Sequence, residues 1–397
     1  MFTELLLKSI GATLIITGTA VGAGMLAIPL VTASLGVWTA SFLLIFCWAL
    51  MLYTALQFLE VNLAFPRAAS FSTMATKTIG PIGAVITWVT ICLLLYALCA
   101  AYITGGSALL GHLTSVLFPK EFPRGFPHLI CVAIFTLFLG GFVFFGTRPV
   151  DYLNRVLMFI KLGAFFILAG LTIPHINPNF LAGNPTFKPV LMALPILITS
   201  FGFHVVIPSI RLYIGDHPKR LRWIIISGCT LPLIIYLLWV MSTLGVLPNT
   251  GPDALSSVVS KGGSVGEMVG LLQNYLHSKQ VQFFVNLFTD VAVTTSFLGV
   301  ALGLFDFMLD GLKVSSKSLA GRLGVWGLVF IIPAGVALFY PQGFVKVLGC
   351  AGIFVAILLL ILPPWMVYKL RGRGNLLMLL TALLGFGVIV LALLSCL

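Results

Sequence analysis

Two hydrophobic stretches of the chain are interrupted by glycine at matching places, and each interruption could bind a charged group. The first reads GTAVGAGMLAIP over Gly18–Pro29, and the second reads TSFGFHVVIPS over Thr199–Ser209. When their prolines are aligned, residues 22–24 fall on residues 201–203. A break inside a membrane helix frees N–H groups that attract anions and C=O groups that attract cations. Because lipid satisfies neither, such backbone persists only where it lines a cavity.

Paired breaks in the two halves of one chain indicate the substrate site of a secondary transporter. Close packing of helices at small residues is the alternative explanation of the glycines. The composition supports membrane helices, since 60% of the 397 residues are apolar, 8% are charged, and the mean hydropathy is +1.14. A soluble domain carries about 25% charged residues. Nearly the whole chain is therefore predicted to lie in lipid.

The net charge of +12 does not indicate nucleic-acid binding, because Lys and Arg cluster between apolar runs rather than along one face. The seven cysteines lie within or at the ends of apolar runs and form no CxxC pair. We expect them to be buried thiols, with neither a metal site nor a disulfide framework.

Hydropathy predicts eleven membrane spans, so the chain is expected to be an all-α polytopic membrane protein. The predicted spans are 9–36, 38–60, 81–110, 128–146, 156–173, 189–212, 222–247, 281–308, 323–340, 344–367 and 375–396. With the N-terminus in the cytoplasm, the inner loops hold more than twice as many Lys and Arg as the outer loops. The positive-inside rule therefore predicts a cytoplasmic N-terminus and an outward-facing C-terminus.

An odd number of spans fits two five-helix repeats plus one extra helix. The repeats would cover residues 1–173 and 189–367, and the extra helix would cover residues 375–397. Because each repeat has an odd number of spans, the two are inverted relative to the membrane, and the broken helix begins each one. In the long outer loop 248–280, the segment Ser256–His277 could form an amphipathic helix, as a surface loop or as a gating lid.

Three more segments carry a distinctive order of residues. They read YALCAAYITG at Tyr96–Gly105, TSFLGVALGLFDF at Thr295–Phe307 and ALFYPQGFVKVLG at Ala337–Gly349. Together with the two broken stretches, they resemble the bacterial hydroxy/aromatic amino acid permease family. The resemblance implies a leucine-transporter-like fold, a multi-pass place in the bacterial inner membrane and proton-driven uptake of an aromatic amino acid. Tyrosine is the expected substrate, and a tryptophan- or phenylalanine-preferring permease is the alternative.

An amino acid carries both charges, so it would use both kinds of free backbone. The ammonium group should meet carbonyls near Ala20 and Val21 in the first break. The carboxylate should meet amide groups where the second half-helix begins, at Gly22, Ala23, Gly24 and Met25. In the second break, the carbonyls expected to bind the ammonium group belong to Thr199, Ser200, Phe201 and Gly202.

Aromatic side chains near these segments could also contact a substrate. Tyr96, in the middle of the third span, carries a phenol that could reach the carboxylate, whereas Tyr102 is expected to be interfacial or gating. Phe201 or Phe203 could form the wall for an aromatic ring. His204 could bind a substrate hydroxyl or pass a proton, or it could simply be satisfied by a neighbouring helix.

Lys161 is the candidate for proton coupling, because it lies inside the fifth span with no acidic neighbour in sequence. The resemblance implies that such a lysine lies between the first and eighth helices, where sodium-coupled relatives bind sodium. Its expected hydroxyl partners are Thr294, Thr295 and Ser296, and Asp290 is a weaker candidate for proton transfer. A lysine that extends to the cytoplasmic interface is the alternative.

Other function classes fit less well. Hydroxyl groups on the eighth span would suit Na⁺, yet the cationic Lys161 argues against a metal ion there. An enzyme is disfavoured because the spans contain no paired carboxylates, His cluster or GxSxG motif. A channel would need a polar stripe through the bundle, which the spans lack. The expected partners are an aromatic amino acid, a proton and the lipid bilayer, with no cofactor and no nucleic acid.

Overall fold

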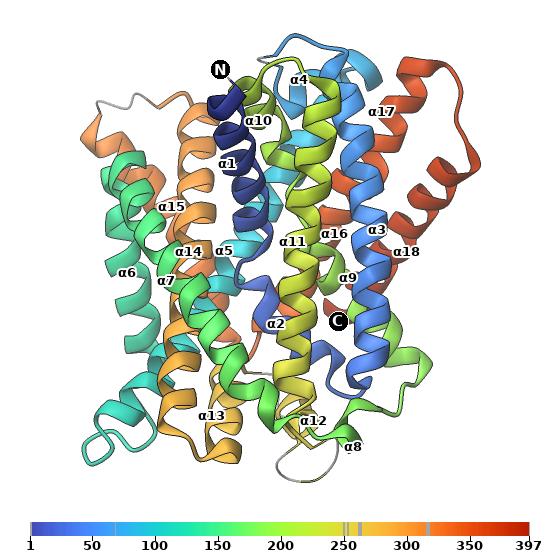
Figure 1. The fold of residues 1–397 in the computed structure, drawn as a ribbon. Helices are drawn as coiled ribbons and strands as arrows, with labels where there is room; N and C mark the ends of the chain where they lie inside the picture. The colour runs from blue at the N-terminus through green and yellow to red at the C-terminus, as the bar shows by residue number, and fades with distance from the viewer. Residues whose placement is uncertain are drawn as a thin grey trace.

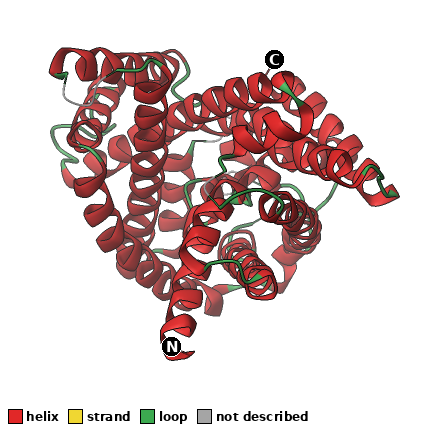
Figure 2. Cartoon of the chain, turned by 90° about the horizontal axis from the view of Figure 1, so that it is seen from above, coloured by secondary structure: helices red, strands yellow, loops and turns green. Residues whose placement is uncertain are grey.

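The computed structural model describes residues 2–67, 69–248, 251, 254–260, 264–314 and 318–396. This part of the chain is a bundle of helices that run mostly along one common direction (Figure 1). Seen from above, the helices pack side by side in one bundle, and loops connect them at its ends (Figure 2). In the described residues, the only β-type pairing is an isolated bridge between Gly36 and Ala182.

In the described residues, ten helices are long and apolar enough to span a membrane, and a bent pair of helices makes eleven when it counts as a single span, as hydropathy predicted. The bent pair is α1 (Phe2–Ala20) and α2 (Gly24–Thr32), whose axes differ by 51°. The other spans are α3 (Gly36–Leu63), α5 (Pro81–Leu117), α6 (His128–Phe145), α7 (Thr147–Thr172), α9 with α10 (Phe187–Ser200 and Ile207–Ile214), α11 (Pro218–Leu244), α14 (Lys279–Gly311), α15 (Leu319–Phe339), α16 with α17 (Phe344–Val355 and Leu362–Arg371) and α18 (Leu376–Cys396).

Short helices cover the two ends of the bundle. At the end that holds the N-terminus lies α4 (Phe71–Ile79), and at the opposite end lie α8 (Pro178–Leu181), α12 (Leu255–Ser260) and α13 (Val265–Leu276) (Figure 1). The long loop predicted to carry one amphipathic helix therefore carries two helices, and residues 261–263 between them lie outside the described part.

Two further spans depart from regular α-helix. Between α9 and α10, residues 201–203 leave the helix and His204–Val206 form a 3₁₀ turn. Between α16 and α17, residues Ala356–Ile361 are π-helical. Pro363 and Pro364 explain this segment, because each lacks an N–H and its ring clashes with the carbonyl four residues earlier.

The packing of the bundle brings the two interruptions together. The half-helix α2 packs against α9, and α11 packs against both α1 and α3. On the other side, the long helix α14 packs along α7 and α5. Exposed apolar side chains such as Phe159 and Phe339 lie on the outside, where lipid is their expected solvent.

The cysteines follow the sequence prediction only in part. Cys47, Cys92, Cys99, Cys131 and Cys229 are free thiols in buried or half-buried positions. The prediction is wrong for Cys350 and Cys396, which form a disulfide that joins α16 to α18. The two residues are 46 positions apart in sequence, and linear spacing does not reveal that the last two spans pack side by side.

We expect Gly36→Ala to destabilise the protein. Gly36 has φ of +71°, and an added Cβ would overlap the backbone of Gly183. A left-handed conformation costs a residue with a Cβ about 1–2 kcal/mol, so the melting temperature of the detergent-solubilised protein should fall by at least about 2 °C. The matched control is Gly163→Ala, in an open position on α7. A variant at Gly36 as stable as that control would contradict the expectation.

Candidate functional site

The first interruption leaves few of its backbone groups free. Gly22 N–H donates to the carbonyl two residues earlier at 2.8 Å, and Met25 N–H donates to Gly22 O at 3.2 Å. Ala23 N–H donates to Ser296 Oγ at 2.7 Å. Among the contacts of the described residues, Gly24 N–H has no acceptor. Of the four amides predicted to bind a carboxylate, Gly24 is therefore the one that is available.

The glycines of this segment also allow neighbouring helices to approach. A Cβ on Gly22 would lie 2.7 Å from Ser296 Oγ, and a Cβ on Gly24 would lie 3.3 Å from Ser200 Oγ. The close-packing explanation therefore applies to Gly22, where a side chain would displace a hydroxyl that binds the interrupted backbone. Close packing and a free backbone are both present at the same place.

The second interruption presents one carbonyl group in particular. Phe201 N–H donates to Ile198 O at 3.1 Å, and Gly202 N–H donates to Thr199 O at 3.0 Å. The hydroxyls of Thr199 and Ser200 bond back to carbonyls of their own helix. The Ser200 carbonyl points instead to a neighbouring helix.

Tyr236 of α11 connects the two interruptions. Its hydroxyl lies 2.6 Å from Ala20 O and 2.7 Å from Ser200 O, so it can donate to either carbonyl. The side chain is fully buried, and its ring packs edge-on against Phe201, with 5.1 Å between centroids. Sequence analysis missed this residue. The available signal was a tyrosine in the middle of a span, since a phenol there needs a hydrogen-bond partner.

Lys161 belongs to the fifth span, α7, and its side chain contacts the first and the eighth spans. Its Nζ donates to Val21 O at 2.7 Å and to Thr295 Oγ1 at 3.4 Å, and the side chain is only 1% exposed. The lysine therefore does not extend to the membrane surface. Of the three hydroxyl groups predicted as partners, Thr295 contacts Lys161, Ser296 binds Ala23, and Thr294 has no side-chain hydrogen bond in the described part of the structure.

The aromatic and imidazole side chains of the second interruption are enclosed by protein. Phe201, Phe203 and His204 are all 0% exposed. His204 Nε2 lies 2.9 Å from Thr54 Oγ1, so its partner is a side chain of the neighbouring helix α3. In the described part of the structure, His204 Nδ1 has no partner. The imidazole is therefore held toward α3.

In the described residues, the predicted site residues Tyr96 and Asp290 form no hydrogen bond or ion pair with the two interruptions. Tyr96 donates to Leu328 O of α15 at 3.3 Å, which places its hydroxyl at the contact between α5 and α15. Tyr102 is buried on the same helix. The two tyrosines are six residues apart and thus about 120° apart around the helix, so sequence depth alone did not identify the inward face. Asp290 forms no ion pair with Lys161 or any other described residue.

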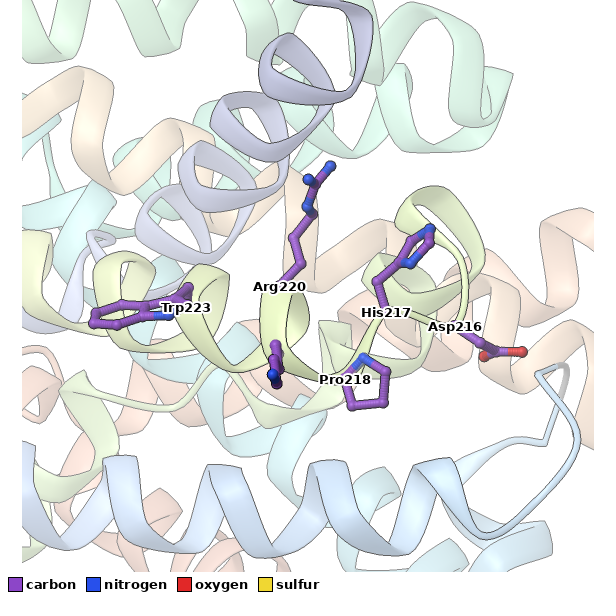
Figure 3. Close-up of a pocket in the computed structure, with 6 residues that line it drawn as sticks. Asp216, His217, Pro218, Arg220 and Trp223 are labelled. Atoms are coloured by element: carbon purple, nitrogen blue, oxygen red, sulfur yellow. The ribbon is translucent and has the colours of Figure 1, made fainter. Parts of the chain in front are cut away.

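Two cavities lie away from the interruptions. One of about 770 Å³ opens at the start of α11 and is lined by Asp216, His217, Pro218, Lys219, Arg220 and Trp223 (Figure 3). The other, about 330 Å³, is mostly apolar and lies beside the far ends of α2 and α9. Neither is lined by a residue of the two interruptions.

An ion cluster beside the larger cavity ties α10 to α3. Arg211 is 5% exposed and donates to Asp216 Oδ1 at 2.7 Å, to the Asn62 carbonyl, and to Phe65 O at 2.8 Å. Arg67 donates to Asp216 Oδ2 at 2.7 Å. The hydrogen bonds from Arg211 and Arg67 lower the pKa of Asp216 below its usual value. The carboxylate is therefore held charged.

Comparison with known proteins gives a consistent family. Residues 7–397 match the model of the tryptophan/tyrosine permease family. The chain is 37% identical to tyrosine-specific transport system 1 of Haemophilus influenzae, over 92% of this chain and 88% of that protein. It is 34% identical to the tryptophan-specific transport protein of Pseudomonas aeruginosa, over 92% and 87%. The low affinity tryptophan permease of Escherichia coli is 32% identical, over 95% and 93%.

Among solved structures, the fold is similar to that of a manganese transporter from Eremococcus coleocola. The TM-score is 0.63 at 15% identity, and the match covers 99% of this chain and 87% of the other. At this identity the similarity concerns the fold, which is of the leucine-transporter type, as the sequence resemblance implied.

Gly22→Ala is expected to slow uptake of a labelled aromatic amino acid by cells, because the new Cβ would clash with Ser296 Oγ. Overpacking of this kind costs about 1–3 kcal/mol, which corresponds to a fall in the initial rate of about fivefold to a hundredfold. In Gly22→Ala with Ser296→Ala, the clashing oxygen is absent, and the rate should return to that of Ser296→Ala alone. A double variant as slow as Gly22→Ala would exclude this steric explanation.

Proposed function

The chain belongs to the tryptophan/tyrosine permease family, and on that premise we propose that it imports aromatic amino acids by proton symport with alternating access. It is a multi-pass protein of the bacterial inner membrane. Its relatives are named as tyrosine and tryptophan transporters, which supports an aromatic amino acid as substrate. The backbone of the two interruptions supports a zwitterionic one.

The proposed binding mode uses the groups that helix geometry leaves available. The carboxylate of the substrate binds Gly24 N–H at the start of α2, where the helix dipole is positive. The ammonium group binds the carbonyls of Ala20 and Ser200, which end α1 and α9. The aromatic ring packs against Phe201 or Phe203, whose stacking contributes about 0.5–1.5 kcal/mol beyond buried area.

The observation that carries proton coupling is the contact between Lys161 Nζ and Val21 O, 2.7 Å long. In the described part of the structure, Lys161 has no carboxylate partner, so its charge is not fixed by an ion pair. When the amine binds a proton, its bond to the carbonyl becomes charge-assisted and stronger. Loss of the proton weakens that bond. Protonation of Lys161 is thereby linked to the conformation of the first interruption.

The same geometry disfavours sodium as the coupling ion. A bound Na⁺ would need several oxygen ligands, and Val21 O and Thr295 Oγ1 would be natural ones. The Lys161 amine already lies against both oxygens. A positively charged amine and a cation would repel each other at this separation.

Lys161→Ala is expected to uncouple transport. In proteoliposomes with an inside-alkaline pH gradient, the wild-type protein should accumulate labelled tyrosine, and a sodium gradient should add nothing. Gradient-driven accumulation should be about 10- to 100-fold lower in the variant than in the wild type. This ratio corresponds to one charged hydrogen bond of about 1.5–3 kcal/mol. Tyrosine exchange without a gradient should persist in it.

The matched control is Lys120→Ala, which removes an exposed lysine in the loop between α5 and α6. It should transport like the wild-type protein. Accumulation by Lys161→Ala that responds to the pH gradient as the wild type does would contradict proton coupling through Lys161. A wild-type protein driven only by sodium would support the sodium alternative.

For substrate preference, we propose tyrosine, with a tryptophan- or phenylalanine-preferring permease as the alternative. The identities to tyrosine-named and tryptophan-named relatives are close, at 37% and 34%. Competition of unlabelled tyrosine, tryptophan and phenylalanine against labelled tyrosine tests the preference. Unlabelled tyrosine is expected to inhibit at the lowest concentration. Stronger inhibition by tryptophan or phenylalanine would reverse the assignment.

The membrane orientation and the internal repeats complete the proposal. The N-terminus is cytoplasmic, residues 1–173 and 189–367 form inverted repeats, and residues 375–397 form the additional helix. In support, α4 and α10, which carry Lys77 and Arg211, lie at the end of the bundle that holds the N-terminus (Figure 1). Lys219 and Arg220 begin α11, a few residues after α10 ends. The positive-inside rule assigns such an end to the cytoplasm.

A further inference from the structure

The Tyr236 hydroxyl lies where the two broken helices present their C-terminal carbonyls. Its oxygen is 2.6 Å from Ala20 O and 2.7 Å from Ser200 O. Ala20 is the last residue of α1, and Ser200 is the last residue of α9. Carbonyls at a helix C-terminus form the negative end of the helix dipole. Two negative helix ends therefore meet at one neutral phenol.

This phenol is an incomplete partner for two carbonyl groups. A tyrosine hydroxyl has one proton, so it can donate a full hydrogen bond to only one of them at a time. Ala20 O also accepts from Gly22 N–H at 2.8 Å, so whenever the phenol donates to Ala20 O, it is Ser200 O that lacks a donor in the described part of the structure. Because Tyr236 is 0% exposed, that carbonyl is left in a buried place, which is unfavourable. An ammonium group has three N–H donors and a positive charge. It would satisfy both carbonyls and both dipoles.

We propose that the Tyr236 hydroxyl occupies the ammonium subsite in the substrate-free molecule and yields Ala20 O and Ser200 O to the amino group of the substrate. The inference rests on the proposed function, because the displacing group is the amine of a transported amino acid. Tyr236 is thus a positioning residue. It keeps the two half-helices joined until a ligand with a matching amine replaces the bond.

The neighbouring contacts restrict where the amine can bind. Val21 O, the next carbonyl along the first interruption, is already bound by Lys161 at 2.7 Å. The amine is therefore directed to Ala20 O, which among the described residues accepts hydrogen bonds from Tyr236 and from Gly22 N–H. The Tyr236 ring remains packed against Phe201 when the hydroxyl bond is lost, so removal of the oxygen alone should leave the packing intact.

Tyr236→Phe tests the proposal in the full-length, detergent-solubilised protein. Three ligands are compared by equilibrium binding: tyrosine, tyramine, which has the amine without the carboxylate, and 3-(4-hydroxyphenyl)propionate, which has the carboxylate without the amine. The variant need not break the hydroxyl bond before it binds an amine. Its affinity for tyrosine and tyramine should therefore rise about three- to tenfold, the size of one neutral hydrogen bond, and its affinity for the propionate should not change.

Tyr53→Phe is the matched control, because it removes a phenol oxygen from another partly buried tyrosine. The Tyr53 hydroxyl donates to Asn375 Oδ1 at 3.4 Å, and Asn375 directly precedes α18. It should bind all three ligands like the wild type. Equal changes for all ligands in Tyr236→Phe, or weaker tyrosine binding, would overturn the displacement proposal while the wild-type protein still binds tyrosine. If the wild type binds none of the three aromatic amino acids, the proposed function and this inference both fail.

Discussion

The structure depends on a single requirement, which is that the interrupted backbone inside the membrane must find hydrogen-bond partners within the protein. Three side chains meet it at the first interruption, and each comes from a different span. Tyr236 of α11 donates to Ala20 O, and Lys161 of α7 donates to Val21 O. Ser296 of α14 accepts from the Ala23 N–H. The interruption is therefore a junction at which four spans are held by backbone atoms that a regular helix would have used itself.

Two kinds of charge are present, and the difference between them bears on function. At one end of the bundle, Asp216 is bound by Arg211 and Arg67, and these bonds keep its pKa low and its charge constant. This cluster holds α10 to α3 without need of a proton. Lys161 is buried, and in the described residues its amine donates hydrogen bonds to the neutral carbonyl of Val21 and the neutral hydroxyl of Thr295. A charged amine without a counter-ion is costly in a buried place, whereas its neutral form is not.

Hydropathy and glycine positions predicted the parts of the fold that depend on local sequence. The number of spans and the places where α1 and α9 end follow from apolar length and helix-breaking residues. The approach of Lys161 to the eighth span was implied by the family resemblance, which did not single out Thr295 among three hydroxyl groups. Contacts that depend on how a helix is rotated about its own axis could not be predicted from local sequence. Sequence depth favours Tyr96 over Tyr102, yet the partner of the Tyr96 phenol is set by which face of α5 meets α15. The role of Tyr236 and the disulfide of the last two spans arise from the same kind of tertiary contact.

Adjacent carbonyls of the first interruption are bound by different helices, and for the proposed symport this offers a physical route between the proton and the amino acid. Ala20 O and Val21 O belong to successive peptide units, so a rotation that turns one toward or away from its partner also moves the other. A proton on Lys161 strengthens the bond to Val21 O and restricts that rotation. An amine that binds Ala20 O restricts the same segment. Two ligands that stabilise one conformation of a shared segment must favour each other's binding, and by linkage the effect is equal in both directions. Symport then needs no direct contact between substrate and proton.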